Sequence, residues 1–288
     1  MSVQSTCPET FDVVIVGCGV SGSTLAFYLA SAGISVLAIE KETFPRYHIG
    51  ESLTGMVRPI IDDMGLAEEM DRRQFPVKGG VKVMGKEAKR EFFVPVLHST
   101  WQVKREEFDQ ILLERAIEAG AQHCQGTVKE VIREGDKVVG VKYQPREGDK
   151  TLKTVRGSIV VDATGQATLF ANQGVAGQRI NYDEFSKQVA VFAQFKNALR
   201  DPGEMGDNTF IFHAQRYHWS WFIPISPEIV SIGIVVPTAK VSECGGKEET
   251  LSWGLENINP DLQKRVKEAE YGEVRSIGNY SYSVDPFV

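Results

Sequence analysis

The sequence has few cysteines and no excess of positive charge. Its 288 residues include four cysteines, Cys7, Cys18, Cys124 and Cys244, with no CxxC pair and no metal-ligand spacing. Scattered thiols of this kind fit a reducing compartment better than a disulfide framework, and they predict no metal site. The 32 Lys and Arg against 38 Asp and Glu give a formal net charge of −6. An acidic chain without a long basic tract has no electrostatic basis for binding nucleic acid.

Long apolar runs and a leader-like start are also missing. The first ten residues, MSVQSTCPET, are polar and do not resemble a signal peptide. The longest apolar runs are far below the roughly 18 residues that a membrane span needs. We therefore expect a cytoplasmic protein with no membrane partner. With 42% hydrophobic residues the chain can build a large core, as one large domain or two closely joined ones.

A glycine-rich turn follows the first apolar run. The run FDVVIVG is typical of a strand buried on both faces of a parallel sheet, and STLAFYLASAG after the turn predicts a helix that ends at Gly33. Between them, Gly17, Gly19 and Gly22 have G-x-G-x-x-G spacing. In a dinucleotide site, the first glycine permits the turn, the second lets the backbone approach a pyrophosphate, and the third lets the helix pack on the sheet.

A second apolar run, ISVLAIE, ends at Glu40, 21 residues after Gly19. A carboxylate at this place accepts hydrogen bonds from a ribose, which favours FAD or NAD over NADP. This unit alone does not separate FAD from NAD.

The segment up to residue 170 narrows the choice of cofactor. An amphipathic helix follows Lys104 and Arg105, three alternating strands cover residues 127–157, and a separate buried strand, SIVVDATG, ends at Gly165. Together with the glycine turn, this order resembles the FAD-binding domain of the glutathione-reductase-like flavoproteins. The resemblance covers residues 11 to about 170 and implies FAD.

The rest of the chain changes character. Residues 187–237 form one strand-like segment after another, which predicts an antiparallel sheet, and Pro260 is expected to separate two helices. The predicted fold class is α/β: a Rossmann-like FAD-binding domain with a β-meander, plus an antiparallel sheet as substrate region. We expect the FAD-binding region over residues 1–185, with interleaved segments that include the Lys78 loop, and the sheet and helical substrate region over residues 186–288.

Two tryptophans stand two apart in the string YHWSWFIPI. Alternation places Trp219 and Trp221 on one face of their strand, with Ser220 and Phe222 on the other. Such a pair is usually core packing. The string W-x-W-x-I-P, however, resembles the signature of the flavin-dependent halogenases, a tryptophan-halogenase-like superfamily. His218 stands where the branch that acts on free tryptophan usually has Gly, which points away from that branch. The interval between Lys78 and Trp219 is shorter than in that branch and resembles the branch that acts on phenols and pyrroles.

Two further segments resemble the same family. FPRYHIGESL, residues 44–53, is similar to its flavin-proximal segment, and FPVKGG, residues 75–80, to the segment with its essential lysine. That lysine is Lys78, which we expect in a loop between a helix and an apolar strand. A lone lysine is usually a surface residue, so the family segment carries this prediction.

The resemblance implies an activity. It is FADH2- and O2-dependent halogenation, with chloride or bromide, of an electron-rich aromatic substrate such as a phenol or pyrrole, either free or bound to an acyl or peptidyl carrier protein. The route implied is a flavin hydroperoxide, hypohalous acid and Lys78. The resemblance also implies a separate NADH-dependent flavin reductase that supplies reduced FAD, and the lack of a second G-x-G-x-x-G in residues 1–288 fits this. The tryptophan string, Trp219, Trp221, Ile223 and Pro224, would keep substrate from the flavin. The predicted cofactor-binding residues are Gly17, Gly19, Val20, Ser21, Gly22, Glu40, Lys41, Arg46, Gly50, Glu51, Ser52, Arg105, Val128, Asp162 and Gly165.

Other function classes stay open. An FAD-dependent aromatic monooxygenase or a geranylgeranyl-reductase-like oxidoreductase would share the glycine turn and DATG, but has no need for Lys78 together with W-x-W-x-I-P. A non-catalytic flavin-binding protein would need neither. Family members continue beyond a segment like IGNYSYSVDPFV with a G-D motif for the ribityl chain. We therefore expect that the family's C-terminal part is absent from residues 1–288, and that this chain binds FAD weakly.

Overall fold

The computed structural model describes residues 10–86, 90–145, 151–181 and 187–285. Contacts divide the chain into two compact units. The first unit combines Met1–His48, Arg105–Ile180 and Ser283–Val288, and the second combines Ile49–Lys104 and Asn181–Tyr282. Residues 49–104, which include Lys78, are therefore part of the second unit, together with residues 181–282. The predicted boundary at residue 185 falls outside the described residues.

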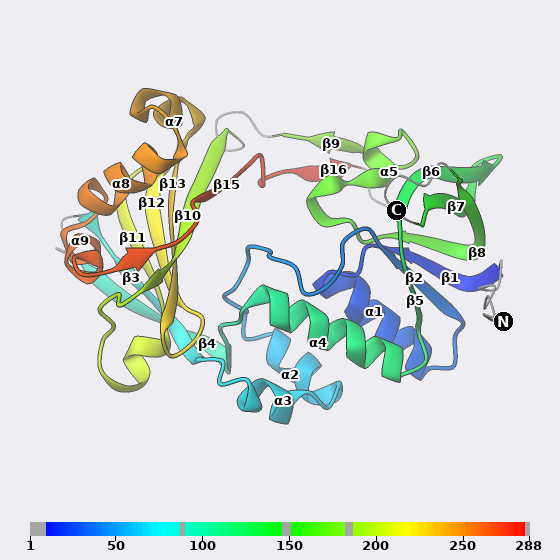
Figure 1. The fold of residues 1–288 in the computed structure, drawn as a ribbon, viewed down its shortest axis with the longest axis horizontal. Helices are drawn as coiled ribbons and strands as arrows, with labels where there is room; N and C mark the ends of the chain where they lie inside the picture. Colours follow the sequence, from blue (N-terminus) through cyan, green and yellow to red (C-terminus); the bar gives the residue numbers. More distant parts are fainter. Residues whose placement is uncertain (1–9, 87–89, 146–150, 182–186, 286–288) are drawn as a thin grey trace. The chain divides into compact units, whose positions relative to one another are not determined.

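The first unit is built on a six-stranded sheet. Its order is β5-β2-β1-β8-β7-β6, with the first four strands parallel and the last two antiparallel additions. Two helices, α1 and α4, pack side by side in this unit (Figure 1). A small two-stranded sheet pairs β9 with β16. The elements are β1 (Thr10–Val16), α1 (Val20–Ser31), β2 (Val36–Glu40), α4 (Arg105–Glu118), β5 (Gln122–Gln125), β6 (Thr127–Glu134), β7 (Lys137–Gln144), β8 (Lys153–Asp162), α5 (Leu169–Asn172), β9 (Gln178–Ile180) and β16 (Ser283–Asp285).

This sheet confirms the strand–turn–helix–strand prediction. The last four residues of β1 are at most 4% exposed, as expected for a strand covered on both faces. Gly33 follows α1 with φ of +79°, the left-handed conformation that a glycine adopts easily. The prediction of separate third meander and SIVVDATG strands is wrong, because residues 153–162 form one strand, β8. Its first half pairs with β7 and much of its length with β1, so one strand joins the meander to the parallel sheet.

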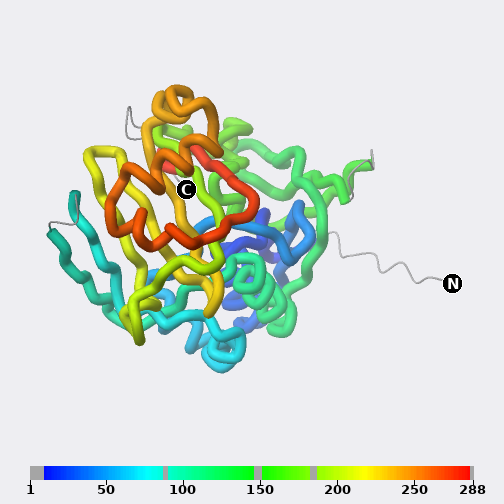
Figure 2. The backbone as a smooth tube through the Cα atoms, turned by 60° about the vertical axis from the view of Figure 1, so that its left-hand side comes forward, coloured from blue at the N-terminus to red at the C-terminus, as the bar shows by residue number. Residues whose placement is uncertain are grey.

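The second unit is built on an eight-stranded sheet. The order is β14-β10-β13-β12-β11-β3-β4, and β15 also pairs with β10. All pairs are antiparallel except β3 with β11, which the sequence did not predict. Figure 2 shows the β3–β4 pair, in cyan, at one edge. The elements are α2 (Val57–Asp63), α3 (Ala67–Arg72), β3 (Val77–Met84), β4 (Glu91–Trp101), β10 (Gln188–Lys196), β11 (Thr209–Gln215), β12 (His218–Pro224), β13 (Ile229–Pro237), α7 (Thr238–Cys244), α8 (Lys247–Asn257), α9 (Pro260–Val266), β14 (Glu270–Tyr271) and β15 (Arg275–Gly278).

The two faces of this sheet differ. Phe210, Phe212 and Phe222 belong to an apolar cluster with residues of α8 and α9, which cover one face (Figure 1). Because side chains alternate along a strand, Thr209 and Trp221 lie on the opposite face. We call this second face, which carries Thr209, Trp219, Trp221 and Gly233, the tryptophan face. The break before Pro260 is confirmed: α8 ends at Asn257, and Asn259 caps α9 through Oδ1, which accepts from the Asp261 N–H at 2.9 Å.

The described residues offer neither a membrane-spanning helix nor a metal site. No helix among them is both long and apolar enough to cross a bilayer. Within the same residues, no group of His, Cys, Asp and Glu side chains is placed to hold a metal ion.

Candidate functional site

A cavity of about 500 Å³ lies in the first unit, and its wall includes the glycine turn. This volume is within the range of sites for small organic ligands. The end of β2, the start of α4 and β6, and the segment after β8 complete the wall. Ten of the predicted cofactor-binding residues line it: Gly17, Gly19, Val20, Ser21, Glu40, Lys41, Arg46, Arg105, Val128 and Gly165.

The glycines of the turn have separate roles. Gly17 has φ of +100°, and a Cβ there would lie 2.5 Å from the Ala163 carbonyl oxygen. A Cβ on Gly22 would lie 1.9 Å from the Gly17 carbonyl oxygen, so Gly22 permits close packing of α1. A Cβ on Gly19 would meet nothing nearer than Arg46 Nη2 at 3.7 Å, so a larger side chain there would fill cavity space. No side chain caps α1 and its first turn has no acidic residue, which leaves its N–H groups available to an anion.

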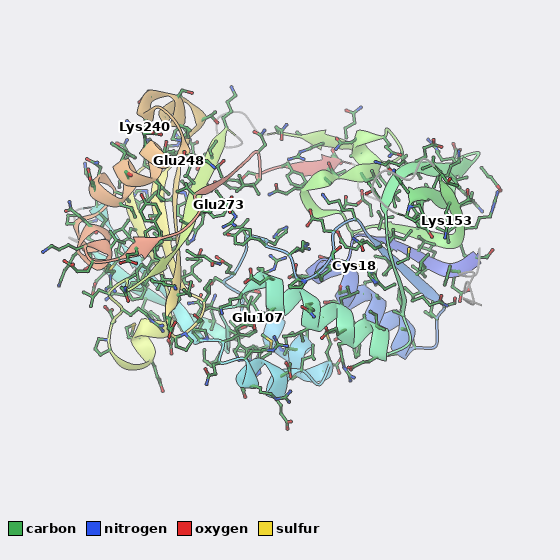
Figure 3. All side chains as sticks on the ribbon, viewed as in Figure 1. Cys18, Glu107, Lys153, Lys240, Glu248 and Glu273 are labelled. Carbon is green, nitrogen blue, oxygen red and sulfur yellow. The ribbon has the colours of Figure 1, made fainter. Side chains whose placement is uncertain are left out.

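Glu40 is held in place before any ligand binds. It is 5% exposed, and its two carboxylate oxygens accept hydrogen bonds from the backbone N–H groups of Cys18 at 2.8 Å and Glu42 at 3.0 Å. A carboxylate fixed at the cavity wall suits a ribose hydroxyl. Burial, and secondarily the charge of Glu40, raises the pKa of the Cys18 thiol (labelled in Figure 3), so this cysteine stays protonated.

Two arginines at the cavity share one buried carboxylate. Asp109, which is fully buried, accepts from Arg46 Nη1 at 2.8 Å and from Arg105 Nε and Nη2 at 2.6 and 2.9 Å. This arrangement fixes both guanidinium groups beside the glycine turn, and Arg46 Nε also lies 3.2 Å from the Glu42 carboxylate. Sequence reasoning missed Asp109. The available signal was its spacing of four residues from Arg105, which places both on one helix face.

The residues present fit the ADP half of FAD. Uncapped helix N–H groups and two arginines suit the pyrophosphate, and Glu40 suits the ribose. Asp162 supports the wall without lining it: its carboxylate accepts from the Thr164 N–H at 3.0 Å, the Thr164 hydroxyl at 2.6 Å and the Phe170 N–H at 2.8 Å. Gly22 likewise acts through packing. The structure places Gly50, Glu51 and Ser52 in the second unit, and they do not line this cavity.

Lys78 is in the second unit, and the prediction that it lies in a loop is wrong. It is the second residue of β3 and is 3% exposed. The glycines after it look like a turn in the sequence, but Gly80 is required inside the strand pair. A Cβ at Gly80 would lie 2.3 Å from Phe93 Cζ and 2.6 Å from the Val94 carbonyl oxygen.

The backbone next to Lys78 is irregular and firmly held. The pairing of β3 with β4 changes register between Lys78 and Gly80. Asn208, which is 4% exposed, accepts from the Gly79 and Gly80 N–H groups through Oδ1, at 2.9 and 2.7 Å. A buried side chain thus replaces the ladder bonds that this irregularity removes.

The Lys78 amine has an uncharged hydrogen-bond partner. Its Nζ donates to Ser52 Oγ at 2.9 Å. Burial lowers its pKa to about 8, and burial is the one cause of that shift. A lysine kept from water in this way is neutral in a large fraction of molecules near pH 8, which makes it a nucleophile.

The tryptophans share one face, as the sequence predicts. Their ring centroids are 6.1 Å apart, and the Trp221 indole N–H donates to Ser231 Oγ at 3.2 Å. Trp221 and Ile223 are each 8% exposed, Pro224 is buried, and Trp219 is half-buried. Through β11, the register sets Trp221 level with Val83 of β3. Val83 lies five residues beyond Lys78, on the order of 15 Å along the strand.

Similarity to known proteins shows the family to which the chain belongs. The family model for FAD-dependent oxidoreductases matches residues 12–221. A 1H-pyrrole-2-carbonyl-[peptidyl-carrier protein] brominase of Pseudoalteromonas luteoviolacea is 46% identical over 282 residues, which cover 97% of this chain and 68% of that protein. A 1H-pyrrole-2-carbonyl-[peptidyl-carrier protein] chlorinase of Pseudomonas fluorescens is 30% identical, covering 95% of this chain and 66% of that one.

Solved structures agree. The flavin-dependent brominase Bmp2 superposes with a TM-score of 0.92 at 45% identity, over 97% of this chain and 69% of that one. The myxobacterial chondrochloren halogenase CndH gives 0.87 at 30% identity, over 96% and 65%. The chain therefore spans about two thirds of the length of these relatives.

Proposed function

Because the chain belongs to the flavin-dependent halogenases, within the FAD-dependent oxidoreductases, we propose that it halogenates an electron-rich aromatic ring and that Lys78 carries the electrophilic halogen. The observation that supports this role most is the burial of Lys78. Lysine is almost never fully buried unless it is paired with a charge, yet this one is 3% exposed and no charge contributes to its lowered pKa.

The first unit would bind the cofactor. Gly17 and Gly19 would admit the pyrophosphate, Arg46 and Arg105 would donate hydrogen bonds to it, and Glu40 would accept from the ribose hydroxyls. FAD, when bound in its reduced form, supplies the activation of dioxygen that oxidises chloride or bromide. We propose, as the resemblance to the family implies, that a separate NADH-dependent reductase supplies the reduced flavin.

Lys78 would take the halogen from hypohalous acid. Its neutral amine attacks the halogen, an N–X bond forms, the O–X bond breaks, and hydroxide leaves with the amine proton as water. The ring carbon then attacks the halogen, and the N–X bond breaks with its electrons returning to nitrogen. The nitrogen takes up a proton from water as the ring releases its own proton to water, which restores the neutral amine. A pKa of about 8 provides the neutral amine near physiological pH.

The tryptophan string would limit access to the oxidant. We propose that Trp219, Trp221, Ile223 and Pro224 keep the substrate apart from the flavin, so that the oxidant reaches the ring only by way of Lys78. The proximity of the two indoles and the fixed Trp221 N–H support a rigid barrier.

The relatives supply the substrate class. Two of them are named for a 1H-pyrrole-2-carbonyl group on a peptidyl carrier protein, one as a brominase and one as a chlorinase. We propose the same class here: a pyrrole held as a thioester on a carrier protein, which would be the macromolecular partner. The identity of 46% to the brominase favours bromide as the halide to test first.

The test compares Lys78→Ala and Lys78→Arg in the complete enzyme, supplied with FAD, NADH, a flavin reductase, bromide and pyrrolyl-carrier protein. Both variants should give no brominated product by mass spectrometry, while FAD binding and dioxygen consumption persist. Arginine fails because its guanidinium is not readily deprotonated. Lys82→Ala is the matched control, because Lys82 is on the same strand but pairs with Glu91 at 3.2 Å, and it should retain bromination.

Two results would contradict the proposal. Substantial brominated product from Lys78→Ala would remove the role of the lysine. A hydroxylated product from the wild-type enzyme, formed equally well without halide, would instead support an aromatic monooxygenase.

A further inference from the structure

A chain of four buried or half-buried polar side chains ends at the Lys78 amine. Lys78 Nζ lies 2.9 Å from Ser52 Oγ, which lies 2.7 Å from Thr209 Oγ1, which lies 2.8 Å from Gln102 Oε1. Gln102 is fully buried, and Thr209 is 4% exposed. Sequence reasoning placed Ser52 among the flavin-binding residues and did not identify Thr209 or Gln102.

The direction of every hydrogen bond in this chain is fixed from its far end. Gln102 Nε2 donates to the Asp207 carbonyl oxygen at 2.7 Å, and a carbonyl can only accept. Gln102 Oε1 therefore faces Thr209 as an acceptor, and the single Thr209 proton is committed to it. Toward Ser52, Thr209 can then only accept, so the single Ser52 proton is committed in turn. Ser52 is left as an acceptor for Lys78.

This polarity has a chemical consequence for the amine. A neutral lysine has two N–H bonds and one lone pair. A serine hydroxyl beside it would ordinarily be able to donate to that lone pair and block it. Here the Ser52 proton is held by Thr209, so the amine donates to Ser52 and its lone pair points elsewhere.

We propose that Ser52, Thr209 and Gln102 form a positioning relay, which holds Lys78 Nζ as a donor to Ser52 and so leaves the lone pair of the neutral amine free for the halogen. This inference rests on the proposed role of Lys78. The three residues touch neither halogen nor substrate in this scheme; they act through Lys78. Ser52 is tied in by backbone as well, since it forms a β-bridge with Gln102.

The relay predicts that loss of a relay residue makes Lys78 more neutral and yet makes bromination slower. In Ser52→Ala the ammonium loses its acceptor, so the pKa of Lys78 should fall further below its value of about 8. A hydrogen bond to a charged group corresponds to about a tenfold change in the protonation equilibrium. In Thr209→Val the freed Ser52 proton can turn to the amine and occupy its lone pair, which also lowers the pKa. Both variants should therefore be more neutral at pH 7 and yet brominate at least about tenfold more slowly.

The pKa is measured without turnover. The complete enzyme is labelled with ¹³Cε-lysine and titrated by NMR, and the Lys78 signal is identified by its loss in Lys78→Ala. Bromination rates are measured in parallel. Ser52→Thr keeps a hydroxyl and should restore both the wild-type midpoint and the rate. Thr250→Val is the matched control, because Thr250 is a fully buried hydroxyl of the same unit that donates to the Gly246 carbonyl oxygen, away from Lys78. It should change neither readout.

Failure of the relay and failure of the proposed function give different results. If Ser52→Ala and Thr209→Val titrate Lys78 at the wild-type midpoint, or brominate at the wild-type rate, the relay is wrong even though Lys78→Ala remains inactive. If Lys78→Ala brominates, the role of Lys78 fails while the titrations still report the hydrogen bonds. If Ser52→Ala or Thr209→Val unfolds, Ser52→Thr decides: a folded Ser52→Thr that brominates about tenfold more slowly than wild type, with a lowered Lys78 midpoint, would overturn the relay.

Discussion

Replacing Gly233 by alanine should displace the Trp221 indole. Gly233 on β13 lies directly opposite Trp221 on β12, and the indole ring occupies the space that a side chain at Gly233 would need. A Cβ at Gly233 would lie 2.1 Å from Trp221 Cζ2 and 2.3 Å from Cη2. Ordinary contact begins near 3.4 Å, so the ring must retreat by roughly 1.3 Å or the strands must separate. Such overpacking costs about 1–3 kcal/mol of unfolding free energy.

The displacement is measured on the protein itself. The two indoles, 6.1 Å apart, should couple in the near-ultraviolet circular dichroism spectrum, and Gly233→Ala should weaken that signal. The indole N–H should also lose its bond to Ser231, seen as a shifted Nε1–H resonance. If Trp221 is part of the barrier, the halogenated fraction of product should fall while reduced-flavin oxidation continues. FAD affinity should not change, because no residue of β12 or β13 lines the cofactor cavity.

Gly278→Ala is the control for this experiment. Gly278 belongs to the same sheet, and a Cβ there would meet Val189 Cγ2 at an ordinary 3.5 Å. It should leave the spectrum, the stability and the product unchanged within error. If Gly233→Ala keeps the wild-type indole signals and stability, the steric reasoning is refuted. If it moves the ring but halogenation is unaffected, Trp221 is core packing and no barrier.

Three further outcomes are expected. Glu40→Ala and Gly19→Val should each weaken FAD binding at least about tenfold by titration, through a lost ribose acceptor and a filled pyrophosphate position; unchanged affinity in both would place the cofactor elsewhere. Burial lowers the pKa of Lys78 to about 8, so the neutral fraction of its amine rises as pH increases. The kcat for halogenation should therefore rise up to about pH 8 and level off above it. A flat profile from about pH 6 to 9 would contradict the amine as nucleophile. Asp109→Ala should lower the unfolding free energy in urea by about 3–5 kcal/mol, because it removes a fully buried carboxylate that pairs with two largely buried guanidinium groups. Asp62→Ala breaks an exposed helical pair and should cost less than about 1 kcal/mol; equal losses would show that Asp109 is no organising residue.

The cofactor cavity could be predicted from the sequence because its residues are local. Gly17, Gly19 and Gly22 follow one strand, and Glu40 ends the next, so spacing alone fixes their place relative to each other. Asp109 was missed because its second arginine, Arg46, is 63 residues away. No short-range pattern reports such a partner.

The environment of Lys78 could not be predicted, because its contacts also come from residues far apart in the sequence. The motif FPVKGG identifies the lysine, but its surroundings come from Ser52, Asn208 and Thr209, up to 157 residues apart in the chain. The glycines misled because a glycine needed for a turn and a glycine needed for close strand approach look alike in sequence. The distinction depends on Phe93, which lies across Gly80 only after β3 and β4 have paired.

The strand location of Lys78 changes how its reactivity should be understood. A lysine in a loop would be positioned by a mobile backbone. Lys78 in β3 is instead held by the pairing of β3 with β4, by Asn208 where that pairing changes register, and by the hydrogen bond from its amine to Ser52. Thr209 begins β11, the strand whose next residue, Phe210, joins the apolar cluster under α8 and α9. Strand β11 therefore packs the core through Phe210 on one face and supports the hydrogen-bonded chain to Lys78 through Thr209 on the other. A site built on strands keeps its geometry more closely than one built on loops, which is what the transfer of a small, highly reactive halogen requires.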